Sequence, residues 1–139
     1  MQTFLPYSDF NKSAACLDWR RLGKQRVEAM QILRALENQN YGWQNHPAVN
    51  MWRGFEAMLA VYHNTIIDEW TSRGYQNNMK LITLDIAPIS PTWMGNLDFH
   101  ASHRSNLLRK DPEHYGQYGW TETDNLPYIW GSKLLDGKK

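Results

Sequence analysis

The helical character of this chain is clearest in the stretch Leu17-Asp18-Trp19-Arg20-Arg21-Leu22-Gly23-Lys24-Gln25-Arg26-Val27-Glu28. Four cations lie within seven residues of it, and a single carboxylate, Glu28, then opens an apolar run that reaches residue 36. Residues three and four positions apart share one face of an α-helix, so Arg21, Lys24, Gln25 and Glu28 fall within one arc. The stretch therefore predicts a helix that carries a cationic strip ending in one acid.

Two interpretations of this strip stand side by side. It fits a surface that binds a phosphate backbone and carries out proton or cation chemistry beside it. It also fits an ordinary solvated helix face with a Lys24–Glu28 ion pair worth about 0.3–0.5 kcal/mol. Local spacing alone favours the solvated face.

The apolar positions around the strip set the length of the first long helix. Leu22, Ala29, Leu33 and Leu36 share one face, and they predict a helix from about Asp18 or Arg21 to Asn38. Gly23 weakens the first turn, because glycine in a helix costs about 1 kcal/mol relative to alanine. A short helical turn, capped by Ser8 or Asp9, is expected before it and ends at Cys16.

Downstream, two further long helices are expected. Pro47 suits the first position of a helix that runs to Arg73-Gly74. Six large side chains recur with helical spacing along this second helix and form one largely aromatic face: Trp52, Phe55, Leu59, Tyr62, Ile66 and Trp70. Packing in the protein core is the simplest role for that face. The third helix should begin at Asn96 or Asp98 and end at Lys110, before Asp111-Pro112. Residues 75–96 and the aromatic tail after 112 are expected to be loops.

These elements predict an all-α fold, a compact single domain over residues 1–139 with three main helices and ordered loops. The 139 residues carry 15 basic and 14 acidic side chains, a net charge of +1, so any affinity for a polyanion must come from local patches. Cations cluster at residues 20–26 and 100–110. One cysteine, no apolar run of about 18 residues and no signal-peptide pattern lead us to expect a soluble cytoplasmic protein without a membrane partner.

Three ordered motifs resemble the pyrimidine-dimer DNA glycosylase family, whose founding member is a phage endonuclease V. Leu17-Asp18 followed by Arg26-Val27-Glu28-Ala29 resembles the helix that carries the family's catalytic glutamate. Asn45-His46-Pro47, with a following helix that ends in Arg73-Gly74-Tyr75, resembles the second motif, and residues 105–120 resemble the closing helix and its aromatic tail.

The resemblance implies a helical fold with the N-terminus packed between helices, and an enzyme that needs no metal or cofactor. In that family the α-amine of the first residue attacks C1′ of the damaged nucleotide, expels the base and leaves an imine, and elimination then cuts the strand. The implied catalytic residues are Met1, through its amine, and Glu28. An α-amine suits this role because its ordinary pKa of about 7.7–8.0 leaves a useful unprotonated fraction near neutrality.

The chain departs from the founding member at its beginning. There the initiator methionine is removed, whereas the bulky Gln2 should prevent its removal here. Gln2 also stands where a basic residue is usual. The Met1 amine is therefore the expected nucleophile, and Lys24, one helical turn from Glu28, is the alternative.

The expected partner is double-stranded DNA that carries a base lesion, with a pyrimidine photodimer as the default, and the protein is expected to be a monomer. The candidate DNA-binding residues are Gln2, Arg20, Arg21, Lys24, Arg26, His46, His103 and Arg104. Of these, His46 could instead cap the helix that Pro47 begins, and Arg26 could be partly buried toward the apolar side of its helix.

Two other functions remain open at this point. The fold could serve as a nucleic-acid-binding module without catalysis, in which case Glu28 has no chemical role. Alternatively, Asp98, His100 and His103 could bind a metal ion for a nuclease, because the two histidines are three residues apart on one helix.

Overall fold

The computed structural model describes residues 1–137, and they form six α-helices and no strand. The all-α prediction is therefore confirmed. The helices are α1 (Phe10–Cys16), α2 (Trp19–Glu37), α3 (Pro47–Trp52), α4 (Glu56–Ser72), α5 (Leu97–Lys110) and α6 (Pro112–Tyr115). Two 3₁₀ segments, η1 (Gly116–Tyr118) and η2 (Gly131–Gly137), complete the described part of the chain. Among residues 1–137 no helix is both long and apolar enough to cross a membrane.

Helix α2 matches the first predicted long helix. The Asp18 carboxylate caps it by accepting a hydrogen bond from the Arg21 amide, and Asn38 ends it. Its apolar face packs on α4, so that Leu22, Ala29, Ile32 and Leu33 are buried. Gly23 has a packing role, because a Cβ there would lie 2.9 Å from the Trp70 ring of α4.

The continuous helix expected from Pro47 to Arg73 is wrong. The chain leaves the helix at Arg53, turns at Gly54 with φ +89°, and restarts as α4. That left-handed conformation strains residues with a Cβ and suits glycine. The break separates Trp52 from the α4 aromatics, yet Trp52 and Tyr62 still pack with ring centroids 6.0 Å apart in the core.

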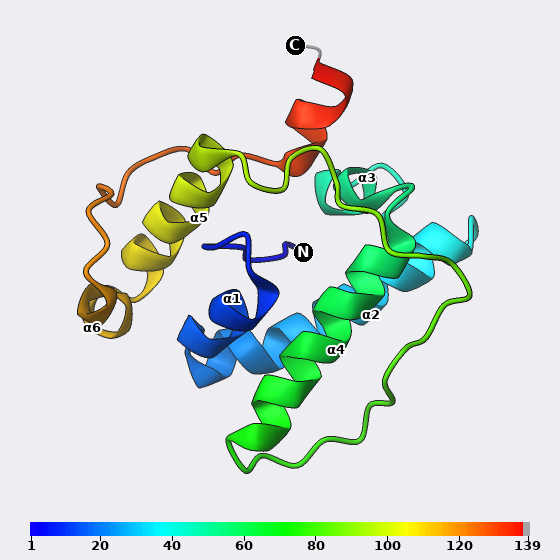
Figure 1. Ribbon diagram of the computed structural model, residues 1–139, viewed down its shortest axis with the longest axis horizontal. Helices are drawn as coiled ribbons and strands as arrows, with labels where there is room; N and C mark the ends of the chain where they lie inside the picture. The colour runs from blue at the N-terminus through cyan, green and yellow to red at the C-terminus, as the bar shows by residue number, and fades with distance from the viewer. Residues whose placement is uncertain (138–139) are drawn as a thin grey trace.

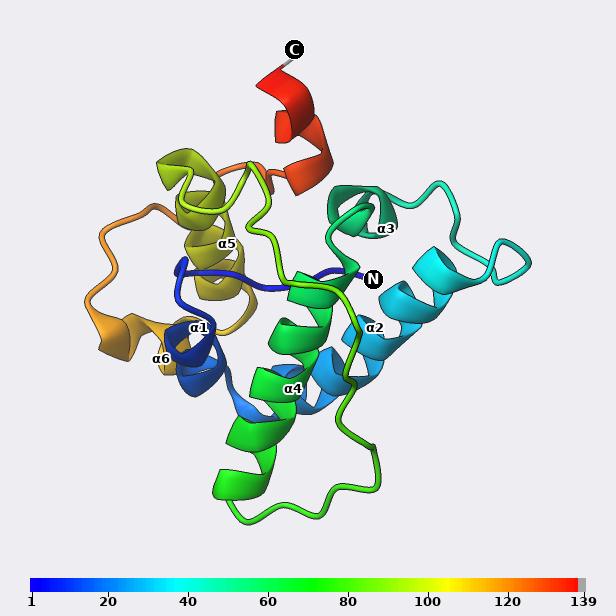
Figure 2. The same ribbon diagram turned by 45° about the vertical axis from the view of Figure 1, so that its right-hand side comes forward.

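Three elements surround the extended segment of residues 1–6, the N-terminal strand, which pairs with no β-strand among residues 1–137. In Figures 1 and 2 this strand runs between α5 on one side and the crossed pair α2 and α4 on the other. Thr3, Phe4, Leu5 and Pro6 are buried there. The expected packing of the N-terminus between helices is thus present, and it places the start of the chain beside the cationic strip of α2.

The third predicted helix is also confirmed as α5, capped by Asn96, whose side chain accepts a hydrogen bond from the Phe99 amide. The tail that follows is more ordered than a loop, because α6 and η1 follow α5 directly. Its aromatic side chains pack: Tyr115 is fully buried and stacks on Trp120 with centroids 5.7 Å apart.

Candidate active site

Side chains bind nearly every backbone polar group of the N-terminal strand. The carbonyl oxygens of residues 2–6 accept hydrogen bonds, in chain order, from Gln25, Tyr128, Tyr62, His100 and Arg104. The amides of Phe4 and Leu5 donate to Gln25 Oε1 and His103 Nδ1, at 3.0 and 2.9 Å. Bonds along both edges hold this strand in one register, so the position of the first residue follows from the packing of α2, α4 and α5.

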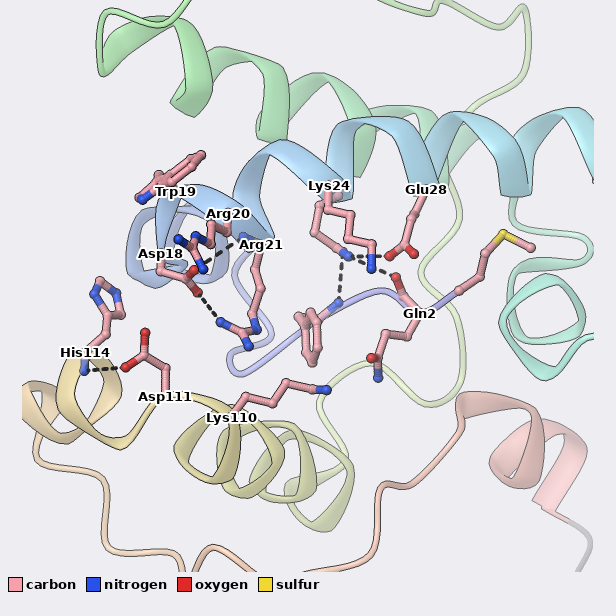
Figure 3. A pocket seen from close by; sticks show the side chains of 13 residues that line it. Gln2, Asp18, Trp19, Arg20, Arg21, Lys24, Glu28, Lys110, Asp111 and His114 are labelled. Atoms are coloured by element: carbon pink, nitrogen blue, oxygen red, sulfur yellow. Dashed lines mark hydrogen bonds and ion pairs between the residues drawn. The ribbon is translucent and has the colours of Figure 1, made fainter.

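The strand ends at a pocket of about 650 Å³ between α2 and the start of α6 (Figure 3). Its walls combine the first residues of the chain with the exposed face of α2 and the end of α5: Met1, Gln2, Phe4, Asp18, Trp19, Arg20, Arg21, Lys24, Gln25, Glu28, Lys110, Asp111 and His114. The pocket therefore brings together Met1 and Glu28, the two residues predicted to be catalytic.

Gln25 connects the N-terminal strand with Glu28. Its Nε2 donates both to the Gln2 carbonyl oxygen, at 2.9 Å, and to Glu28 Oε1, at 3.2 Å. Its Oε1 accepts from the Phe4 amide and from the Tyr62 hydroxyl, at 3.0 and 2.6 Å. Because Gln25 is only 1% exposed and uses both ends of its amide, it holds the carboxylate and the strand in a fixed relation.

Met1 lines the same pocket, and its amine makes no direct ion pair with Glu28. Within the described residues no nitrogen–oxygen contact of 4.0 Å or less joins the two groups. The amine is also close to His46: burial lowers the pKa of that imidazole, and the positive N-terminus lowers it further.

Cations outnumber carboxylates around the pocket. Arg20, Arg21 and Lys24 project from α2, and Lys110 from the end of α5 faces them (Figure 3). Within residues 1–137 Lys24 and Lys110 have no ion pair, so their charge is available to a polyanion. The pocket has the electrostatic character of a phosphate-binding surface.

Asp18 has a structural role in this wall. It caps α2, pairs with Arg21 at 3.1 Å and accepts a short hydrogen bond from the Tyr115 hydroxyl. Burial acts to raise the pKa of Asp18, but the hydrogen bonds from Tyr115 and Arg21 outweigh it and leave the pKa below its usual value. Asp18 is thus a bound anion that joins α2 to α6, and Glu28 is the carboxylate that Gln25 links to the N-terminal strand.

Two of the candidate DNA-binding residues, His103 and Arg104, lie outside the pocket, because α5 turns them toward the N-terminal strand. His103 is fully buried between the N-terminal strand and Tyr128, and burial lowers its pKa to about 3. Arg104 donates to the Pro6 carbonyl oxygen and pairs with Glu122 at 2.7 Å. Both residues position the N-terminal strand and do not line the pocket.

The predicted metal site loses its ligands for the same reason. His100 Nδ1 donates to the Leu5 carbonyl oxygen at 2.7 Å, and its Nε2 accepts from the Gly95 amide at 2.9 Å. His103 likewise uses one nitrogen on Leu5 and the other on Ile129. Since every ring nitrogen of the pair is hydrogen-bonded, these residues do not support a metal-dependent nuclease, and residues 1–137 contain no other cluster suited to a metal ion.

Arg26 and His46 also differ from a simple DNA-contact role. The Arg26 guanidinium stacks on Trp70, 4.3 Å from the ring centroid, and donates to Asn77, so it does not line the pocket. His46 caps α3 by accepting a hydrogen bond from the Ala48 amide at 3.0 Å, which was the alternative considered for it.

Several pocket residues had been given no role from the sequence. Gln25 lies three residues before Glu28 on the same face of the predicted helix, and that spacing indicates that the two side chains can contact each other. Lys110, Asp111 and His114 had no such signal, because only the packing of α5 and α6 beside α2 brings them to the pocket.

Comparison with known proteins finds one family. The family model described as pyrimidine dimer DNA glycosylase matches residues 1–83. The match includes the N-terminal strand and α1 to α4, hence Met1, the α2 strip and Glu28. It does not extend to residues 105–120, where a resemblance was also expected. No curated protein and no solved structure matches the chain.

Proposed function

This chain belongs to the pyrimidine dimer DNA glycosylase family, and from that premise we propose that it is a DNA repair glycosylase with abasic-site lyase activity. The substrate is double-stranded DNA that carries a damaged or modified base, with a pyrimidine dimer as the default. The protein acts as a single domain over residues 1–139 and as a monomer, and the chemistry needs no cofactor.

In the proposed reaction the unprotonated Met1 amine attacks C1′ of the damaged nucleotide. The bond from C1′ to the base breaks, and the base leaves with the electron pair and takes up a proton. The sugar ring then opens to an iminium ion between C1′ and the Met1 nitrogen. Glu28 stabilises the cationic sugar and the iminium, and it removes the C2′ proton so that the C3′–O bond breaks with phosphate as the leaving group.

One observation carries this proposal: the backbone of the N-terminal strand and the Glu28 carboxylate share a donor, Gln25 Nε2. A mobile chain end would have to be ordered before each reaction, at a cost in conformational entropy. The hydrogen-bonded strand reduces that cost, because residues 2–6 are already ordered beside the pocket before DNA binds.

The DNA contacts follow from the same geometry. We assign phosphate binding to Arg20, Arg21 and Lys24, with Gln2 at the edge of the pocket and Lys110 opposite α2. His46 lies close to the Met1 amine. In this proposal the cations hold the backbone of the strand to be cut, and the amine and Glu28 act on the sugar between them.

Reductive trapping tests the proposal. Borohydride added to the protein with an abasic duplex should reduce the imine and give a covalent adduct, and peptide mass spectrometry should locate that adduct on residue 1. An added Gly-Ser before Met1 should abolish the adduct, whereas Lys24→Arg, which keeps the charge, should retain it. Loss of the adduct in Lys24→Arg alone would assign the nucleophile to Lys24.

Glu28→Gln separates catalysis from binding. The variant should bind lesion-bearing duplex like wild type but turn over about 10²–10⁴-fold more slowly, the usual contribution of a positioned acid–base group. Asp68→Asn, an exposed carboxylate on α4, is the matched control and should leave turnover unchanged. Folded wild-type protein that binds DNA in a salt-dependent manner but forms no adduct would instead identify a non-catalytic binding module.

A further inference from the structure

The tail of the chain returns along α5 and passes beside the N-terminal strand. Two serine hydroxyls of α5 fix its backbone. Ser105 Oγ accepts a hydrogen bond from the Leu126 amide at 2.9 Å, and Ser102 Oγ accepts one from the Ile129 amide at 3.0 Å. In Figure 1 the tail, drawn in orange, runs from α6 past α5 to η2. It lies outside residues 1–83, the stretch that matches the family model, so the match assigns it no role.

Tyr128 binds the N-terminal strand from this tail. Its hydroxyl donates to the Thr3 carbonyl oxygen at 3.0 Å. Its ring stacks on the His103 imidazole, with centroids 4.3 Å apart and an angle of 19° between the planes. The same ring meets the Phe4 ring edge-on, with centroids 6.5 Å apart. Because two neighbours fix the ring, the hydroxyl has little freedom to leave the Thr3 carbonyl group.

The Tyr128 hydroxyl also lies near the residues proposed to be catalytic. Burial raises the pKa of this phenol, and the negative charge of nearby Glu28 raises it further. A hydrogen bond from the Gln2 side chain lowers the pKa by less than burial raises it. The hydroxyl therefore keeps its proton at neutral pH, so it can donate to Thr3 while it accepts from Gln2.

Side chains from two distant elements thus bind successive peptide groups at the start of the chain. Gln25 of α2 donates to the Gln2 carbonyl oxygen at 2.9 Å, and Tyr128 of the tail donates to the Thr3 carbonyl oxygen at 3.0 Å. One contact alone would leave the end of the strand free to rotate about it, whereas two contacts on neighbouring groups fix its direction. Residue 1 precedes both contacts, so they determine the direction in which its amine leaves the strand.

We propose that Tyr128 is a positioning residue for the Met1 amine. Through the Thr3 carbonyl group and the Gln2 side chain, it holds the first residues in the orientation in which the amine meets the sugar. It acts through the strand and does not touch the reacting atoms. The inference rests on the function proposed above, because it concerns the same nucleophile, and it makes the tail a part of the active site.

Tyr128→Phe tests the role, because it removes the hydroxyl and keeps the ring. With an abasic duplex and saturating protein, the rate of adduct trapping by borohydride should fall about tenfold, while the Kd for the duplex stays within about twofold of wild type. A purely structural residue would lower the melting temperature but leave the rate of the folded protein unchanged. Tyr75→Phe is the matched control, since it removes a hydroxyl from a ring that is 39% exposed and does not line the pocket.

The outcomes separate this proposal from the proposed function. An adduct with wild-type protein and an unchanged rate in Tyr128→Phe would overturn the positioning role and leave the glycosylase reaction intact. No adduct with folded wild-type protein would overturn both.

A second measurement does not depend on activity. In nuclear magnetic resonance spectra of the ¹⁵N-labelled full chain, the side-chain amide of Gln2 should shift in Tyr128→Phe and keep its position in Tyr75→Phe. An unmoved Gln2 signal would overturn the contact on which the proposal stands. If Tyr128→Phe does not fold, Gln2→Met breaks the same contact from the strand and keeps a bulky residue after Met1. It should then slow trapping at saturating protein, and a wild-type rate would overturn the proposal.

Discussion

Gln25→Glu is the perturbation that most directly tests how the active site is held together. The change is nearly isosteric, but it replaces the Nε2 donor with an oxygen. The Gln2 carbonyl and Glu28 Oε1 both lose their donor, and a second carboxylate stands where the donor was 3.2 Å from Glu28. The glutamate Oε1 can still accept hydrogen bonds from the Phe4 amide and the Tyr62 hydroxyl.

The magnitude follows from the geometry. Loss of a hydrogen bond at a buried site costs about 1–3 kcal/mol. Two carboxylates in contact repel by roughly 5 kcal/mol at an effective dielectric constant of about 20, so at neutral pH the pair retains a shared proton rather than two full charges. We expect the free energy of unfolding to fall by about 2–4 kcal/mol at pH 8.

The pH dependence distinguishes repulsion from simple loss of contacts. The folded-state pKa of the new pair is raised above the unfolded value of about 4.3, so the loss of stability is absent below about pH 4.3, grows as the pH rises from there, and levels off above the folded-state pKa. Urea unfolding at pH 5 and pH 8, each compared with wild type, should therefore give the larger loss at pH 8. Gln25→Met, which lacks both the bonds and the charge, should give an equal loss at both values.

Activity provides the second measurement. If Gln25 positions Glu28 and the N-terminal strand, Gln25→Met should lower the rate of adduct formation with an abasic duplex while DNA affinity stays near wild type. Gln25→Glu with the stability of wild type at both pH values, together with an unchanged trapping rate in Gln25→Met, would refute the reasoning.

Three other outcomes can be measured on the same protein. His103 is neutral in the fold, with its pKa lowered to about 3 by burial, so its contribution to stability should be constant above about pH 6.5 and fall below it by up to about 1.4 kcal/mol per pH unit, in addition to the contributions of His46, His63 and His100, whose pKa values burial also lowers. His103→Asn, which retains an acceptor, should reduce the slope in acid titrations of unfolding. Gly23→Ala should lower the free energy of unfolding, measured in urea, by about 1–3 kcal/mol, because the new Cβ would lie 2.9 Å from the Trp70 ring. In most helices the same substitution raises stability. In a Trp70→Leu background, Gly23→Ala should no longer destabilise the protein. Lys110→Gln should reduce the slope of log affinity against log salt by about 0.9 if it binds a phosphate, whereas Arg109→Gln, whose side chain binds a backbone oxygen at 2.7 Å, should leave the slope unchanged.

Local sequence was sufficient to predict a helix where its apolar spacing and its end residues lie within a few turns of one another. The apolar period of α2 predicts a helix from about Asp18 or Arg21 to Asn38, and the structure has it at Trp19–Glu37. The same reasoning failed at Gly54, because a helical period that continues across Arg53 does not reveal a left-handed turn between two helices. Gly23 shows the converse: it looked unfavourable in a helix, and its reason, the Trp70 ring, lies 47 positions away on α4.

The residues of the candidate site also differ in whether local sequence could place them. Arg21, Lys24, Gln25 and Glu28 share an arc of one helix, so their grouping follows from a period of 3.6 residues and could be derived from the sequence. His103 and Arg104 belong to α5, and which way that helix turns its faces depends on the N-terminal strand it covers. Their types suggested DNA contact, whereas burial and the carbonyl groups of that strand determine their actual role.

By itself, then, the sequence determined the helices, the cationic strip and the acid that ends it, because each is encoded by residues within a few turns of one another. Only the tertiary structure decided where the first residue lies, that Gln25 joins the Gln2 carbonyl to Glu28, and that Lys110 completes the pocket from α5. The physical reason is that these relations depend on hydrogen bonds and packing between segments up to about a hundred residues apart, whose geometry no local period specifies.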